Sequence, residues 1–166
     1  MAIFLVLGSY FSASAETVSI GGATADVGVY YNQQYGYAVG ATIHVEKGSP
    51  VNVGCLFLNS DFRYELRNSS NRVVPILQSG LAIADGPREA GPAFVSKPNQ
   101  SPGTCERRLP NEDFPIVRRA MRLSALYPNL PLGSYTLRIT FAPQGLSEQA
   151  QLAPITIVVD KNHPIL

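Results

Sequence analysis

Hydrophobic and polar residues alternate along much of this chain with the two-residue period of a β-strand. In the clearest run, Tyr135, Leu137, Ile139 and Phe141 share one face, while polar residues occupy the other. Further runs predict strands at 17–20, 39–46, 51–57, 62–67, 72–77 and 155–159. Short strands separated by turns, without a long helical period, predict an all-β protein whose strands pack as an antiparallel sandwich.

One region breaks this pattern. Residues 79–115 contain six prolines and four glycines, and predict a long loop inserted between strands. The segment that follows, 116–126, fits either a strand or a short helix. The total of 166 residues suits one domain with a sizeable core, so we expect a single sandwich domain that carries this insertion.

The first residues resemble an export signal. A short apolar run ends near Gly8, and Ala13 and Ala15 form an A-x-A-like cleavage site, so residues 1–15 are predicted to be removed. The mature domain would then span 16–166 in an extracytoplasmic location, periplasmic or secreted, with no transmembrane span left. No Lys or Arg precedes the apolar run, so a buried first strand is the alternative.

The chain contains two cysteines, Cys55 and Cys105. An even pair in an exported chain predicts one disulfide, which would attach the inserted loop to the strand that bears Cys55. Two unpaired buried thiols are the alternative, because sequence spacing does not establish proximity.

Several short motifs resemble those of exported bacterial immunoglobulin-like domains. They are the Gly-x-Pro-Val turn at 48–51, the Asn-Ser pair at 59–60, the polar hairpin at 64–75 and the Gly-x-Tyr entry at Gly133 and Tyr135. The resemblance covers about 40–160 and implies an immunoglobulin-like antiparallel β-sandwich with a long Pro/Gly-rich insertion. Gly133 and Tyr135 also resemble a tyrosine corner, in which the Tyr hydroxyl bonds to nearby backbone. Such domains are mostly binding, adhesive or scaffold modules, and some inhibit proteases; no catalytic residue carries over.

Two groups of residues are candidates for binding. Four of the eight tyrosines lie between 30 and 37, namely Tyr30, Tyr31, Tyr35 and Tyr37, and suit stacking on sugars or anchoring a protein. Tyrosines packed on the sandwich are the alternative. The second group is a basic stretch that includes Arg107, Arg108, Arg118, Arg119 and Arg122, for which an ordinary charged surface is the alternative.

Motifs for catalysis or metal binding are absent from the sequence. His44 and His163 are the only histidines, and no HxH, HExxH, CxxC, P-loop or Gly-x-Ser-x-Gly pattern occurs, so we expect no metal, no cofactor and no enzyme activity. The net charge of +1 argues against nucleic-acid binding. The sequence therefore favours an exported binding or scaffold module for a protein or glycan. The alternative is a protease inhibitor acting through the disulfide-tethered loop. A third possibility is a small hydrolase whose active-site residues are dispersed along the sequence.

Overall fold

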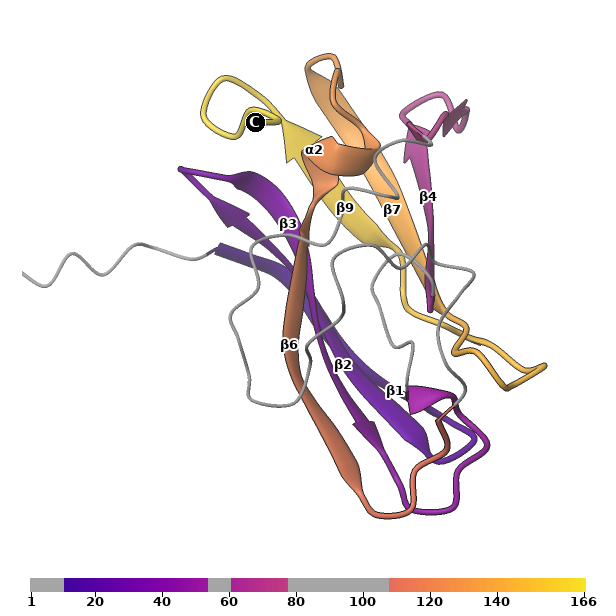
Figure 1. Cartoon of the computed structure of the whole chain (residues 1–166). Coiled ribbons are helices and arrows are strands. Elements are labelled where there is room, and N and C mark those ends of the chain that lie inside the picture. Colours follow the sequence, from indigo (N-terminus) through magenta and orange to yellow (C-terminus); the bar gives the residue numbers. More distant parts are fainter. Residues whose placement is uncertain (1–10, 54–60, 78–107) are drawn as a thin grey trace, which may run out of the picture.

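The computed structural model describes residues 11–53, 61–77 and 108–166, which form two antiparallel β-sheets (Figure 1). The first sheet has the order β1-β2-β3-β6, and the second has β5-β4-β7, with β8 and β9 both on the far side of β7. The strands of the first sheet are β1 (Phe11–Ile20), β2 (Ala23–Asn32), β3 (Gly36–Val45) and β6 (Phe114–Arg122). Those of the second are β4 (Phe62–Asn68), β5 (Val73–Val74), β7 (Gly133–Phe141), β8 (Ala150–Gln151) and β9 (Ile155–Val159). The described chain is therefore all-β apart from one short helix, α2 (Leu123–Leu126).

The two sheets share one hydrophobic core. The predicted inward face of β7 is buried, and Leu137 and Ile139 are fully enclosed together with Ile43 and Val45 of β3. β2, β4, β7 and β9 each contribute every second side chain to this core, as the pleat requires. The alternation predicted for β7 and the strand predicted at 155–159 are thus confirmed.

The first sheet begins with a tight hairpin. Only Gly21 and Gly22 separate β1 from β2, and both have positive φ, +56° and +77°. Two successive positive φ values define a type I′ turn, whose twist matches that of the paired strands. The hairpin aligns β1 with β2 along its whole length, with one register shift between Ser12 and Ser14.

Two other predictions hold with different bounds. The segment 116–126 contains both alternatives, because β6 ends at Arg122 and α2 follows directly. Pro75 predicts an edge or a bulge for its strand, and β5 does form the edge of the second sheet. Only two residues of that strand pair with β4, since proline has no N–H to extend the ladder.

Some predicted boundaries need correction. The loop predicted at 79–115 includes Phe114 and Pro115, which instead pair with β3. The described residues of the predicted strand 51–57, Val51 and Val53, are buried but are not in a strand. β1 also crosses the predicted boundary after Ala15, which pairs with Gly28.

At the start of β7, a tyrosine hydroxyl makes the predicted hydrogen bond to nearby backbone. The Tyr135 hydroxyl donates a 2.8 Å hydrogen bond to the carbonyl of Pro131, four residues upstream. Gly133 lies between them, at the first position of the strand. The bond therefore links the first buried side chain of β7 to the backbone that precedes the strand.

Candidate functional site

The turn between β2 and β3 presents a tyrosine to solvent. Asn32 holds this turn, because its side-chain oxygen accepts the backbone N–H of Gln34 at 2.7 Å and its carbonyl accepts that of Tyr35 at 3.2 Å. Gly36 completes the turn with a φ of +71°, which few other residues adopt without strain. The Tyr35 side chain at the tip remains 40% exposed.

An arginine from a different strand supports Tyr35. The guanidinium carbon of Arg122 lies 4.5 Å from the centre of the Tyr35 ring, within cation–π range. Tyr30 pairs with Ala38, and Ala38 pairs with Arg122. Tyr30, Ala38 and Arg122 therefore form one row across the outer face of the first sheet. We call Tyr30, Tyr35 and Arg122 the hairpin platform. It offers aromatic rings and a cation on one surface.

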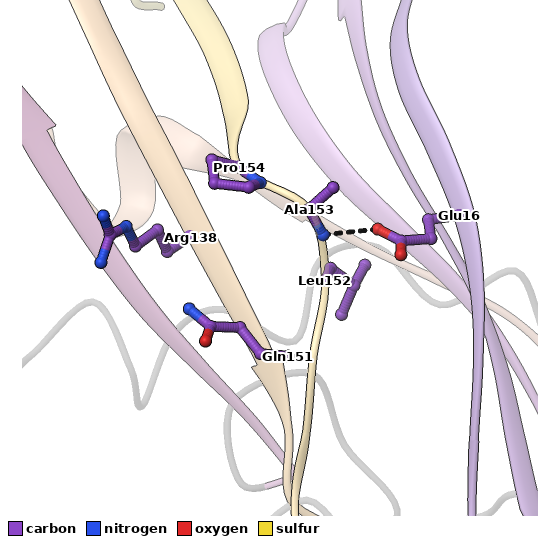
Figure 2. A pocket seen from close by; sticks show the side chains of 6 residues that line it. All are labelled: Glu16, Arg138, Gln151, Leu152, Ala153 and Pro154. Atoms are coloured by element: carbon purple, nitrogen blue, oxygen red, sulfur yellow. Dashed lines mark hydrogen bonds between the residues drawn. The ribbon is translucent and has the colours of Figure 1, made fainter.

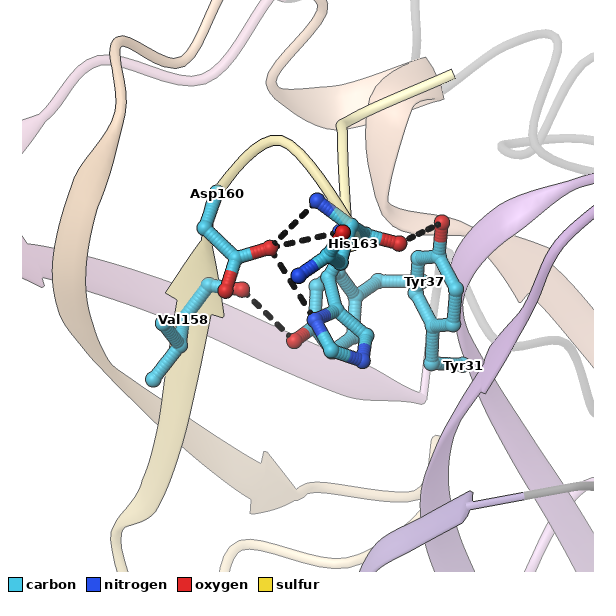
Figure 3. A network of polar contacts seen from close by, with 6 residues as sticks. Tyr31, Tyr37, Val158, Asp160 and His163 are labelled. Atoms are coloured by element: carbon cyan, nitrogen blue, oxygen red, sulfur yellow. Dashed lines mark hydrogen bonds and ion pairs between the residues drawn. The ribbon is translucent and has the colours of Figure 1, made fainter.

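The other two tyrosines of this segment are buried and do not contribute to a binding surface. Tyr31 and Tyr37 pair across the hairpin with ring centres 5.0 Å apart, and their exposed fractions are only 6% and 7%. The Tyr37 hydroxyl donates to the carbonyl of Val158, and that of Tyr31 to the carbonyl of Asn162 (Figure 3). Burial raises the pKa of both phenols, and the nearby Asp160 carboxylate raises it further. Tyr37 thus joins the first sheet to β9, and Tyr31 joins it to the C-terminal loop, so their predicted role in binding is corrected.

The C-terminal loop closes over this tyrosine pair. The carboxylate of Asp160 accepts the backbone N–H groups of Asn162 and His163, at 2.8 and 2.7 Å, and lies 3.0 Å from His163 Nδ1. These contacts, the His163 backbone bond foremost, hold the pKa of Asp160 below its usual value. The His163 ring also lies edge-on to Tyr31, 4.8 Å between centres. The cluster fastens the loop to the β2–β3 hairpin.

A second feature that the sequence did not predict lies where β8 and β9 meet. Three residues, Leu152–Pro154, stand opposite two residues of β7, Arg138 and Ile139. The backbone N–H of Leu152 still bonds to Ile139 at 3.0 Å, but the extra residue forms a bulge in the edge strand.

The bulge is tied to the other sheet. Ala153 directs its N–H to the carboxylate of Glu16 on β1, at 2.6 Å. Figure 2 shows Glu16 reaching this strand from one side, while Arg138 and Gln151 lie on the other. An open hollow of about 500 Å³ surrounds the bulge. Its lining residues are Glu16, Arg138, Gln151, Leu152, Ala153 and Pro154.

The predicted basic stretch does not gather on one surface of the described chain. Arg107 lies outside the described residues, and only the backbones of Arg118 and Arg119 are described, within β6. Arg108 bonds through its backbone to Asn52, beyond the end of β6 at which Phe114 pairs with Val45. Arg122 is at the opposite end of that strand, roughly 27 Å from Phe114 for eight residue steps of extended chain.

Both cysteines, Cys55 and Cys105, also lie outside the described residues, so the disulfide stays a prediction. Their described neighbours are nevertheless in contact. The N–H of Val53 donates to the carbonyl of Arg108 at 2.9 Å, and the N–H of Arg108 donates to the Asn52 side chain at 2.9 Å. Val53 precedes Cys55 by two residues and Arg108 follows Cys105 by three.

Comparisons with protein-family models, with curated proteins and with solved structures find no significant match to this chain. Within the described ranges, no group of three or more His, Cys, Asp and Glu side chains has the arrangement of a metal site. Nor does any described helix have the length and apolar character to cross a membrane.

Proposed function

We propose that this protein is an exported, non-catalytic binding module that recognises a glycan or a protein through the hairpin platform. The carrying observation is the exposed Tyr35 ring, held over Arg122 at the tip of a fixed turn. A tyrosine fixed in this way presents apolar area with little ordering cost on binding. The adjacent cation of Arg122 adds a hydrogen-bond donor for polar groups of the ligand.

Two observations support an immunoglobulin-like sandwich as the finer fold. The two antiparallel sheets share one core, and Tyr135 bonds to the carbonyl of Pro131 as in a tyrosine corner. Export is proposed from the apolar start and the A-x-A site alone. The pairing of Ala15 with Gly28 favours the alternative, a first strand that is retained.

The platform is tested by partner capture with the immobilised chain, using a glycan array and extracts of the producing cell's envelope. We expect Tyr35→Ala to lower retention of the captured ligand by about tenfold, the equivalent of about 1.4 kcal/mol. Leu132→Ala is the matched control, because Leu132 is another exposed large apolar side chain, 65% exposed, at the entry to β7. Equal retention by both variants, each folded by near-ultraviolet circular dichroism, would rule the platform out.

A second candidate is a protease inhibitor that uses the Pro-rich connection as bait. The observation that favours it is the pair of hydrogen bonds joining Arg108, where that connection ends, to Asn52 and Val53. Such an anchor, with a Cys55–Cys105 disulfide nearby, would restrain the connection and reduce the ordering cost of binding. A panel of secreted proteases tests it: one of them should lose activity at a stoichiometric amount of protein, and recover it after reduction. Full activity of every protease in excess protein would count against inhibition.

A further inference from the structure

The solvent face of the second sheet carries three arginines around one carboxylate. The register places Arg138 of β7 directly opposite Glu65 of β4, and diagonally next to Arg63 and Arg67. Threonine hydroxyls fill the adjoining positions of this face. They belong to Thr136, Thr140 and Thr156. This surface lies on the sheet that does not contain the hairpin platform.

Only one of the three guanidinium groups is paired with the carboxylate in a hydrogen bond. Arg67 donates from Nε to Glu65 at 2.7 Å and from a terminal nitrogen to the carbonyl of Asn71 at 3.1 Å. Arg63 is exposed, and its one side-chain hydrogen bond to another described residue is a long one, 3.4 Å to the side chain of Gln149. Arg63 and Arg138 therefore retain donors for an external anion.

Arg138 has a donor that lacks an acceptor. Its Nε–H is enclosed, yet it has no hydrogen-bond partner among the described residues. Enclosed donors in folded proteins are nearly always paired, so an unpaired one requires a specific explanation. Arg138 also borders the hollow at the β8–β9 bulge, beside the amide side chain of Gln151. An acceptor that enters the hollow reaches both side chains.

We propose that this face binds an acidic polysaccharide, with a carboxylate or sulfate group held by Arg138 at the edge of the hollow. A guanidinium binds such planar or tetrahedral oxyanions through two parallel N–H donors. Because the Arg138 Nε–H is enclosed, its donation to the anion requires the side chain to turn toward the hollow. Gln151 and the threonine hydroxyls provide partners for sugar hydroxyl groups, and Arg63 provides a second cation for the next acidic group along the polymer. We call Arg63, Arg138 and Gln151 the anion face.

The chemistry of the surface favours a polysaccharide over other polyanions. Its outward side chains are mainly hydroxyl, amide and guanidinium groups, and peptide recognition usually adds pockets for apolar side chains. Nucleic-acid binding depends on many cations that neutralise successive phosphates, whereas this chain has a net charge of only +1. The regular, open sheet suits a linear polymer lying across it.

The test uses the full chain with labelled heparin and polygalacturonate as probes, neutral dextran as the blank and polyglutamate as the acidic-peptide probe. At low ionic strength we expect binding to heparin or polygalacturonate, and about a tenfold rise in Kd for Arg138→Gln and for Arg63→Gln. Lys161→Gln removes the same charge from the exposed C-terminal loop and should leave Kd unchanged. The Arg138 Nε–H resonance in ¹⁵N NMR should shift as the probe is added.

Three results would overturn the proposal. They are an absence of binding to both polysaccharides, an equal loss of affinity in Lys161→Gln, and tighter Arg138-dependent binding of polyglutamate. Arg63 is exposed, so Arg63→Gln keeps the test valid if Arg138→Gln disturbs folding. Tyr35→Ala in the same assay separates this proposal from that of the hairpin platform, because heparin or polygalacturonate binding should not depend on Tyr35.

Discussion

The hydroxyl of Tyr37 on β3 donates a 2.7 Å hydrogen bond to the main-chain carbonyl of Val158 on β9, and so ties a side chain of the first sheet to the backbone of the second. The bond lies at the end of the core where the C-terminal loop folds back over Tyr31 (Figure 3). It explains why a tyrosine, rather than phenylalanine, occupies this buried position.

Removing that hydroxyl should weaken the link between the sheets. We expect Tyr37→Phe to lower the free energy of unfolding by about 1 kcal/mol, because the Val158 carbonyl loses a buried donor. Urea unfolding measures the change. Tyr35→Phe is the control, since Tyr35 lies at the exposed turn and its loss should be near zero. Equal stability of Tyr37→Phe and the parent chain would contradict a structural role for the bond.

The bulge between β8 and β9 depends on an acceptor from the opposite sheet. Glu16→Ala leaves the Ala153 N–H without its carboxylate partner and should cost about 1–2 kcal/mol of unfolding free energy. Glu16→Gln keeps an acceptor oxygen and should cost less. Glu148→Ala removes an exposed carboxylate from the β7–β8 connection and serves as the control for net charge. The interpretation fails if Glu16→Ala and Glu148→Ala unfold at the same urea concentration.

Buried tyrosines should make the protein sensitive to alkali. Burial raises the pKa of Tyr127 to about 12, whereas an unfolded tyrosine titrates near 10. Below pH 10 the phenol is protonated in both states and has no effect. Between pH 10 and 12 only the unfolded chain loses this proton, so stability falls with rising pH, by about 2–3 kcal/mol from this residue.

Chemical denaturation at a series of pH values measures this effect. Tyr127→Phe should lose less stability than the parent between pH 10 and 12, with the remaining decline arising in part from Tyr64, whose pKa burial also raises. Parallel curves for Tyr127→Phe and the parent chain would show that Tyr127 is not the titrating group.

Alanine substitutions at two glycines allow the effect of backbone strain to be measured separately from that of a steric clash. Gly145 and Gly48 both have positive φ, +99° and +82°, so alanine is strained at either position. A Cβ at Gly145 would press against the carbonyl oxygen of Pro50, whereas at Gly48 it would meet nothing within 4 Å. We expect Gly145→Ala to be about 2 kcal/mol less stable than Gly48→Ala in urea. Equal losses of unfolding free energy would mean that the loop around Gly145 can move away from the added Cβ without losing stability.

The predicted disulfide can be tested by mass. Val53 and Arg108 are hydrogen-bonded, which brings the chain near Cys55 and near Cys105 to the same region. We expect protein purified without reductant to resist alkylation until it is reduced, and reduction to cost about 4 kcal/mol in the chain-entropy model for a loop of this length. Immediate alkylation of both thiols in the folded chain would instead favour two free cysteines.

The parts of the fold that were predictable are those with a local signature. Alternation in β7 reveals which face is buried, because each side chain's direction depends only on its position in the strand. The sequence pattern does not predict β2, because Ala23, Ala25 and Gly28 have weak β-propensity. This strand is stabilised instead by its pairing with β1 on one side and β3 on the other. Sheet order depends on contacts between distant segments and had no local signal.

The candidate sites show the same division. Tyr37 shares the alternation of Val39, Ala41 and Ile43, so extending that pattern by one step would have placed it inside the core. The anion face has no such signal, since Arg63, Arg138 and Gln151 meet only through the register of β4, β7 and β8. No property of any one segment indicates that the Arg138 Nε–H lacks an acceptor.

The pairing of β1 with β2 would also affect the order of events if residues 1–15 were a cleaved export signal. A processing peptidase would cleave the peptide bond after Ala15 only where the chain is free and extended. In the folded protein, Ala15 pairs with Gly28 within the ten-residue strand β1. Cleavage there would have to precede folding or wait for local opening of the sheet edge. The rate of cleavage would therefore have to exceed the rate of folding. If cleavage were slower, residues before Glu16 would remain paired in β1 of the folded protein.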